Sequence, residues 1–266
     1  MIRIRDLRKR FQARNPLKGF VLYIEELNIE SGEIVYFLGP NGSGKTTLLA
    51  LVQGVVEADS GSIMLEGMQN TEAVDLMRLA AHNRAKYLGV VPQDSDEALV
   101  NEMTIADHVL IALSRSDSIP MFFPKLRLRS SMGGILSQFE LGFENRLNEY
   151  VGNLSGGERQ VLTFCMATVI KPVVMLLDEF TSALDPEMAR KVLDIVMSFL
   201  RSNGLTALIV THRHKEAIDN ADRIVVLHKG NAHCEIRRGN ADFSEERLKA
   251  IFSDLYSLEN NSALAE

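Results

Sequence analysis

The sequence predicts an α/β fold with a mostly parallel sheet, a small antiparallel β subdomain and an inserted helical subdomain. The parallel sheet is predicted by three apolar runs that each end in polar residues, at 87–91, 173–177 and 205–210. Continuous apolar strands are typical of parallel sheets that are covered on both faces. Because ligands bind beyond the carboxyl ends of such strands, the polar residues there are expected to converge on one ligand.

The composition sets bounds on this fold. The chain has 266 residues, of which 46% are hydrophobic, so it can bury a sizeable core as one large domain or two small ones. The formal net charge of −6 argues against bulk nucleic-acid binding. Residues 3–18 are locally basic, which indicates the solvated face of an edge strand and loop; attraction to anionic lipid or to a partner is the alternative.

Neither a membrane span nor a signal peptide is predicted. No apolar run approaches the ~18 residues of a spanning helix. Arginines interrupt the N-terminus where a signal peptide needs an apolar core, so the expected location is the cytoplasm. Cys165 and Cys234 lie far apart in the sequence and are interpreted as reduced structural thiols.

The order of the elements follows from the periodicity. Ile2 and Ile4 alternate with arginines as in a half-exposed strand, and 21–27 and 62–65 complete the predicted antiparallel sheet. Between Gln93 and Lys171 no strand is needed, and helices are predicted at 104–113, 134–139 and 159–170. The irregular stretch 114–133 is interpreted as a surface loop or helix start, with a docking surface as the alternative.

The C-terminal part of the chain completes the pattern. A hairpin is predicted from 224–228 and 232–236, joined by 229–231. A terminal amphipathic helix is predicted at 243–258.

A glycine-rich loop follows the apolar run 34–38 and precedes a helix-forming stretch that ends at Gly54. The loop fits G-x-x-x-x-G-K-[ST], the P-loop, whose backbone N–H groups and helix N-terminus bind phosphate. Lys45 would reach the β- and γ-phosphates, and the Thr46 hydroxyl would ligate Mg²⁺. The flanking strand and helix disfavour the alternative, a glycine-rich turn with a chance lysine. A P-loop NTPase core is thus predicted, with nucleotide-binding residues Gly39, Pro40, Asn41, Gly42, Ser43, Gly44, Lys45, Thr46 and Thr47.

Two carboxylates stand at the end of the run 173–177. Asp178 suits a position at the Mg²⁺ ion, usually through water. Glu179 can face the attacking water, and a base placed in this way contributes ~10²–10⁴-fold to the rate. The alternative is an acidic surface turn, which the P-loop in the same chain disfavours.

A second helix N-terminus is predicted at 154–160. Ser155 and Glu158 have the spacing of a capping box, and apolar residues follow at helical spacing. Such an N-terminus is a second anion site in the same chain. The residues alone do not say which anion binds there, and an ordinary cap with two glycines is the alternative.

Together these segments resemble the ATP-binding cassette (ABC) ATPase family, from near the N-terminus to about residue 240. The P-loop matches the family's Walker A motif, 174–179 its Walker B motif, and 154–160 the signature usually written LSGGQ. Gln93 matches the Q-loop, 182–185 the D-loop and His212 the switch histidine. The resemblance implies a cassette over 1–240, with its helical subdomain at about 94–170, and a C-terminal helical tail at 241–266.

The resemblance also implies that ATP and Mg²⁺ bind in a head-to-tail homodimer. Each ATP would lie between the P-loop of one subunit and the signature of the other, with Asp185 crossing the interface. The signature residues in trans would be Ser155, Gly156, Gly157 and Glu158. The catalytic residues would be Glu179, His212 and Gln93, and the metal ligands Thr46, Gln93 and Asp178.

Three positions bear on how far the family pattern applies. Glu158 replaces the usual glutamine and leaves the capping box intact. Arg213 follows the histidine where an acidic residue or asparagine is common, which puts any contact of that carboxylate in doubt. Phe11 stands in the place of the aromatic residue that stacks on adenine, with a core phenylalanine at a strand end as the alternative.

The expected function is the ATP-hydrolysing subunit of a transporter, peripheral on the inner face of the cell membrane and paired with separate integral-membrane permease subunits. A single cassette resembles importer architecture, and 106–111, 139–147 and 166–168 resemble subunits that serve amino acids or related small solutes. An extracytoplasmic solute-binding protein is a further expected partner, and nucleic acid is not. Resemblance places the permease groove beside 94–103, with Leu99 among its contacts. The alternative is a soluble ABC ATPase without a transport role, such as an iron–sulfur assembly ATPase.

Overall fold

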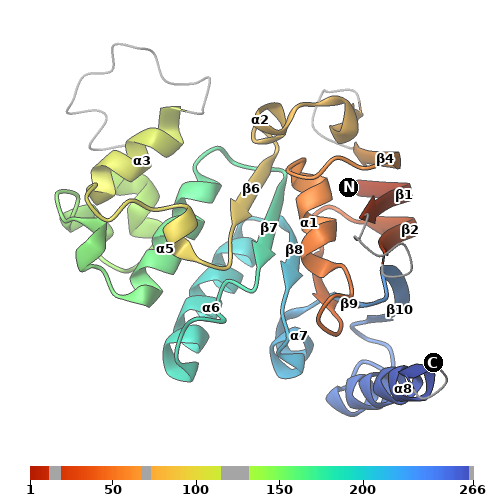
Figure 1. Ribbon diagram of the computed structural model, residues 1–266. Helices are drawn as coiled ribbons and strands as arrows, with labels where there is room; N and C mark the ends of the chain where they lie inside the picture. Colours follow the sequence, from red (N-terminus) through yellow and green to blue (C-terminus); the bar gives the residue numbers. More distant parts are fainter. Residues whose placement is uncertain (12–18, 67–72, 115–131, 264–266) are drawn as a thin grey trace. The chain divides into compact units, whose positions relative to one another are not determined.

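The computed structural model describes residues 1–11, 19–66, 73–114 and 132–263, which form two compact units (Figure 1). The first unit comprises Met1–Leu79 and Leu208–Glu266, and the second comprises Ala80–Ala207. Each unit contains parallel strands together with helices, and the first also contains an antiparallel sheet, so the predicted fold class is confirmed. Most of the stretch 114–133 lies outside the described residues. The domain bounds given above remain a prediction.

Four strands of the first unit form the predicted antiparallel sheet. β1 (Ile2–Phe11) lies between β2 (Phe20–Ile29) and β4 (Ser60–Leu65), and β5 (Val74–Asp75) pairs with β4. The alternation in β1 buries Ile2 and Ile4 completely. Three of the basic side chains of β1 form ion pairs: Arg3–Glu66, Arg5–Glu26 and Lys9–Asp59.

The other strands of the first unit follow the order β10-β9-β3-β8. All five residues of β3 (Ile34–Leu38) are buried, and β3 pairs in parallel with β9 (Arg223–His228). The division between the units falls within β8 (Thr206–Val210). The unit also contains α1 (Lys45–Gln53), α7 (His214–Asn220), β10 (Asn231–Arg237) and α8 (Glu245–Ala263).

The predicted hairpin is confirmed, although its turn is one residue shorter than expected. Asn231 pairs with His228, so only Lys229 and Gly230 form the turn. Both have a positive φ, 46° and 81°, which matches the two-residue turns that follow the right-handed twist of a hairpin. Asn231 therefore belongs to β10.

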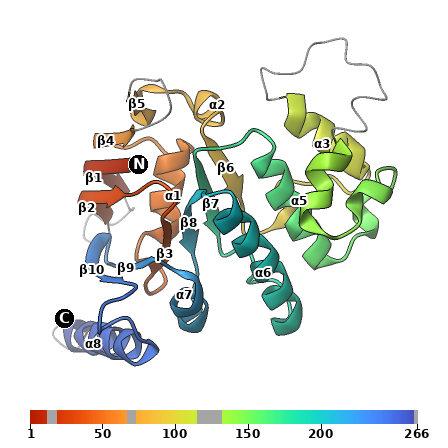
Figure 2. The same cartoon turned by 180° about the vertical axis from the view of Figure 1, so that it is seen from behind.

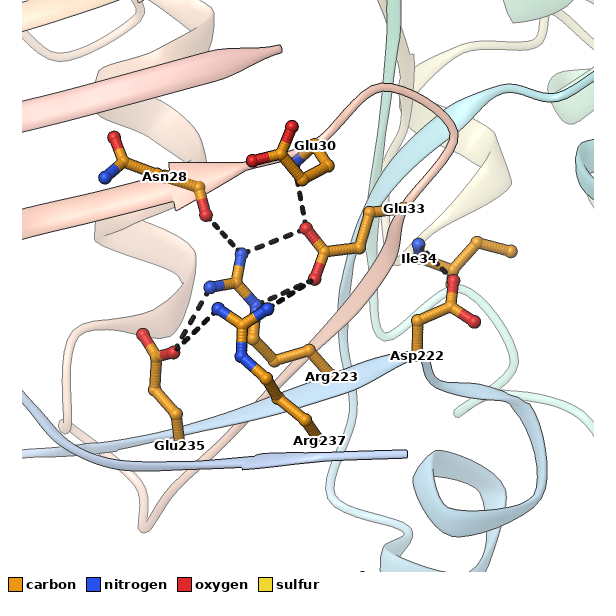
Figure 3. A network of polar contacts seen from close by, with 8 residues as sticks. All are labelled: Asn28, Glu30, Glu33, Ile34, Asp222, Arg223, Glu235 and Arg237. Carbon is orange, nitrogen blue, oxygen red and sulfur yellow. Dashed lines mark hydrogen bonds and ion pairs between the residues drawn. The ribbon is translucent and has the colours of Figure 1, made fainter. Parts of the chain in front are cut away.

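A buried arginine ties the two sheets of the first unit together (Figure 3). Arg223 is 2% exposed, and its Nε lies 2.9 Å from Oε1 of Glu33, in the turn between β2 and β3. Its other nitrogens reach Glu235 on β10 at 3.2 Å and the carbonyl of Asn28 at the end of β2. The neighbouring Asp222 accepts a hydrogen bond from the Ile34 N–H at 2.8 Å. These contacts hold the beginning of β3 against β9 and β10.

The second unit combines two parallel strands with a group of helices (Figure 2). β6 (Leu88–Val91) pairs in parallel with β7 (Val174–Asp178), with Val91 opposite Leu177. The helix α5 (Gly156–Thr168) packs against β6, α3 and α6. The other helices are α2 (Ala81–Arg84), α3 (Ile105–Ser114), the short helix 132–136 and α6 (Pro186–Ser202).

Aromatic side chains fill the centre of this helical group. Phe139 stacks on Phe199 with ring centroids 4.9 Å apart, and both rings are nearly perpendicular to that of Phe164. Among the described residues between 93 and 171, the β-structure is limited to an isolated bridge between Thr104 and Tyr150. Within the described ranges, the helices are too short or too polar to span a bilayer.

Candidate nucleotide site

The loop from Gly39 to Gly44 connects β3 to α1 in the first unit. Glycine is required at two positions of this loop, at one because a neighbouring strand is too close for a Cβ and at the other because φ is positive. A Cβ at Gly39 would lie 2.2 Å from the Leu227 carbonyl oxygen, and Gly44 has a φ of 106°. The loop can therefore pass close to β9 and turn sharply into α1, which presents its backbone N–H groups on one side.

Three features of this loop fit a bound phosphate. Gly44 caps α1 without a side-chain hydrogen bond, so the first N–H groups of the helix lack a side-chain acceptor. Ser43 Oγ is buried, and among the described residues it has no hydrogen-bond partner. The buried Lys45 ammonium donates to the carbonyls of Gly39 at 2.8 Å and Pro40 at 3.1 Å. The loop thus has donors placed for an anion, and the exposed Thr46 lies in the first turn of the same helix.

An open cavity of about 560 Å³ adjoins the loop at Gly42 in the first unit. Its aromatic wall includes Phe20, whose Cζ would lie 3.1 Å from a Cβ at Gly44. Phe11 is 37% exposed and packs on Phe20 with ring centroids 6.1 Å apart. From the sequence, only Phe11 was predicted as an aromatic residue that stacks on adenine, and Phe20 was not. The pairing of β1 with β2 places Phe20 directly opposite it, and that pairing was the available signal.

His212 lies near the same loop because β8 ends beside β3. The Thr211 N–H donates to the carbonyl of Phe37 in β3, at 3.4 Å. The Arg213 N–H donates to Thr211 Oγ1 at 3.2 Å, and Arg213 is the N-cap residue of α7. This turn leaves the His212 side chain exposed at the edge of the sheet where β3 enters the glycine loop.

The second unit brings Gln93, Asp178 and Glu179 to the carboxyl ends of β6 and β7. Gln93 Nε2 donates to Ser182 Oγ at 3.2 Å, and the Ser182 N–H donates to the Glu179 carbonyl at 2.8 Å. Glu179 has a φ of 43°, a left-handed conformation that a non-glycine residue rarely adopts. Such strain persists where the surrounding structure fixes it, and it is concentrated at functional sites.

The capping box predicted at the start of α5 is confirmed. Ser155 Oγ accepts from the Glu158 N–H at 3.3 Å, and Glu158 Oε2 accepts from the Ser155 N–H at 2.8 Å. Burial acts to raise the pKa of Glu158, but hydrogen bonds from Arg146 and Ser155 outweigh it and hold that pKa below its ordinary value. Gly157 lets α6 approach, because a Cβ there would lie 2.3 Å from Met188 Sδ.

Asp185 lies at the beginning of α6. Its Oδ1 accepts from the N–H groups of Glu187 and Met188, both at 3.1 Å, so the carboxylate caps this helix. Asp185 is exposed, and Pro186 follows it at the first helical position. The structure thus gives Asp185 a local role in addition to the predicted role across an interface.

The comparisons with known proteins agree on one family. Residues 24–182 match the family model described as "ABC transporter". The chain is 30% identical over 237 residues to a tyrosine transport ATP-binding protein of Clostridioides difficile. The aligned region covers 89% of this chain and 92% of that protein. The chain belongs to the ABC transporter family.

Two further matches extend the assignment. The cassette is 32% identical over 231 residues to the sulfate/thiosulfate import ATP-binding protein CysA of Acinetobacter baylyi, covering 86% of this chain and 60% of that protein. Its fold matches a solved dimeric ATP-binding cassette in a post-hydrolysis state bound to ADP and Pi. That match has a TM-score of 0.72 and 24% identity, and it covers 90% of this chain and 100% of the other. The predicted family and ATPase class are confirmed, and the chain is an ABC ATP-binding subunit.

The ABC assignment leaves the role of each residue a prediction. The predicted site residues fall into two groups, one in each unit. The first unit holds the residues of the glycine loop, Phe11 and His212. The second unit holds Gln93, Asp178 and Glu179 at strand ends, with Ser155 and Asp185 at helix starts.

Proposed function

We propose that this ABC ATPase binds MgATP at the glycine loop and hydrolyses it as a head-to-tail homodimer, driving solute transport through separate membrane subunits. The observation that carries the proposal is the buried Ser43 Oγ beside the uncapped N-terminus of α1. A buried hydroxyl without a partner in the described structure is costly, and a phosphate oxygen would satisfy it. The loop residues thus fit the phosphates of ATP.

Each polar residue has a distinct proposed task. Glu179 accepts the proton of the attacking water, and His212 orients that water against the γ-phosphate. Thr46, Asp178 and Gln93 would hold Mg²⁺, directly or through water. The ion, when bound, would neutralise charge on the β- and γ-phosphates. The hydrogen bond from Gln93 to Ser182 supports a coupled arrangement, because it links the two strand ends that carry Gln93 and Glu179.

The Glu179→Gln variant tests this function. It removes the base and keeps the phosphate-binding groups, so ATP should bind without turnover and the chain should become an ATP-dependent dimer. Size-exclusion chromatography with and without MgATP reports the dimer, and a fluorescent ATP analogue reports binding. Glu187→Gln is the matched control, since Glu187 is exposed and forms an ion pair with Lys191 one turn further along the same helix. A Glu179→Gln chain that binds ATP and stays monomeric would contradict the proposed dimer.

The contact with the permease is proposed to lie on the second unit. Leu99, expected above to be a docking contact, is only 5% exposed and belongs to the core, so that expectation is wrong. The adjacent Val100 is 49% exposed, and its N–H donates to Nε2 of the buried His108 at 2.9 Å. Large apolar side chains that are exposed close together mark surfaces where other molecules bind, whereas single ones are common on protein surfaces. Among the described residues of this unit, further large apolar side chains that are exposed are those of Leu110, Ile111 and Tyr150.

The transported solute is proposed to be an amino acid or a related small molecule, taken up with the help of an extracytoplasmic binding protein. The tyrosine transport relative supports this class, whereas the sulfate/thiosulfate relative is named for a chemically different solute. The chain would work peripherally on the inner face of the cell membrane. The test is the ATPase rate in proteoliposomes with a permease that co-purifies with this chain. Stimulation by sulfate and not by amino acids would refute the proposed solute class.

A further inference from the structure

The carboxylate of Glu158 is fully engaged at the N-terminus of α5. Its Oε2 accepts from both the N–H and the Oγ of Ser155, each at 2.8 Å. Its Oε1 forms an ion pair with Nη1 of Arg146, which lies 12 residues before Glu158 in the same unit. One oxygen therefore caps the helix, and the other is held by a cation.

A glutamate at this position brings an electrostatic problem to the proposed function. A carboxylate in the first helical turn interacts favourably with the helix dipole. The same charge repels the γ-phosphate that α5 is proposed to receive from a second copy of the chain. A glutamine would complete the capping box without this charge. The repulsion matters only if nothing neutralises Glu158.

The position of Arg146 matches that need. Its Nε and Nη2 lie 2.6 Å and 3.0 Å from the two carboxylate oxygens of Glu149, a forked pair that fixes the plane of the guanidinium. The remaining arm, Nη1, points to Glu158. Arg146 also follows directly after the turn Phe143–Asn145, which orients its backbone. The cation is therefore anchored from one side and presented to α5 from the other.

We propose that Arg146 is a positioning residue for hydrolysis: it neutralises Glu158 and so makes the N-terminus of α5 acceptable to the phosphate of a nucleotide bound by a second copy. This inference rests on the proposed head-to-tail function. Arg146 itself does not touch the nucleotide. It acts through Glu158, and its importance depends on the charge of that residue.

The test measures the ATPase rate of the full-length chain against ATP concentration at low ionic strength. Arg146→Gln should raise the KM for ATP by roughly tenfold, because an unscreened carboxylate then faces the phosphate. Adding Glu158→Gln to that variant should return the KM to within about twofold of the Glu158→Gln single variant. Raising the salt concentration should reduce the Arg146→Gln defect, since exposed charges are screened.

Glu149→Gln is the matched control for a purely structural role. It removes the charge of Glu149 but keeps one side-chain oxygen that accepts from Arg146, so the cation stays beside Glu158 and the KM should be unchanged or lower. If Arg146→Gln fails to fold by circular dichroism, Arg146→Lys is used instead: it keeps the charge but loses the fork, so its KM defect should be smaller than about tenfold and should disappear when Glu158→Gln is added. The inference is overturned if the double variant stays as defective as Arg146→Gln, or if Glu149→Gln shows the same defect. Failure of the proposed function would show separately, as a Glu179→Gln chain that never dimerises with ATP.

Discussion

Replacing Arg223 by methionine should destabilise the first unit by about 3 kcal/mol, because breaking a buried ion pair from one side costs about 3–5 kcal/mol. Glu33, whose side chain is 10% exposed, would lose its cation at 2.9 Å. The lower end of the range applies, since Glu33 Oε2 still accepts from the Glu30 N–H at 2.8 Å and Oε1 keeps Arg237 at 4.0 Å. The Asn28 carbonyl also loses its donor.

Urea unfolding followed by circular dichroism measures this loss, and amide hydrogen exchange at β3 and β9 assigns it to the first unit. Arg237→Met is the matched control. Arg237 is 54% exposed and lies 3.8–4.0 Å from its carboxylates, so its loss should cost less than about 0.5 kcal/mol. The affinity of Arg223→Met for ATP should stay within about threefold at low temperature, because the glycine loop is untouched. Equal stability of the two variants would refute the reasoning.

Two further predictions separate binding from turnover. Lys45→Ala should weaken the binding of a fluorescent ATP analogue by about a hundredfold, since two charge-assisted hydrogen bonds to phosphate are lost; Lys215→Ala, at an exposed lysine of α7, should not. Wild-type affinity of Lys45→Ala would rule out the glycine loop as the site. Ser155→Arg should leave this binding intact and stop hydrolysis, because it breaks the capping box and blocks the N-terminus of α5. A turnover rate within a few-fold of wild type would show that α5 does not complete the site.

Local sequence patterns were sufficient for the elements that carry the site. β3 spans Ile34–Leu38 as predicted, because each of its residues is apolar and a glycine follows. The capping box correctly placed the N-cap of α5 at Ser155, although the helical run itself was expected only from 159 to 170. Periodicity identifies the apolar face of a helix, whereas the cap determines where the helix begins.

The features that the sequence did not predict depend on long-range contacts or on backbone strain. Nη2 of Arg223 donates to Asn28 and Glu33, which are 195 and 190 positions away in the sequence. No local sequence pattern encodes contacts of this range. Leu99 and Val100 are neighbours with similar hydrophobicity, yet Leu99 is 5% and Val100 49% exposed, a difference that depends on tertiary packing. The left-handed conformation of Glu179 likewise follows from its surroundings and not from its residue type.

The two helix N-termini of this cassette are prepared in different ways, and the difference supports the proposed dimer. The N-terminus of α1 has no side-chain cap and lies next to the buried Ser43 hydroxyl and the Lys45 ammonium, so it favours a phosphate from solution. The N-terminus of α5 is already capped by Ser155 and Glu158, so it does not require an anion for stability. Because α5 is stable without a ligand, its N-terminus is already formed when a second copy of the chain brings the phosphate. That order of events explains why a change in the α1 loop should abolish binding, while a change at Ser155 should affect turnover alone.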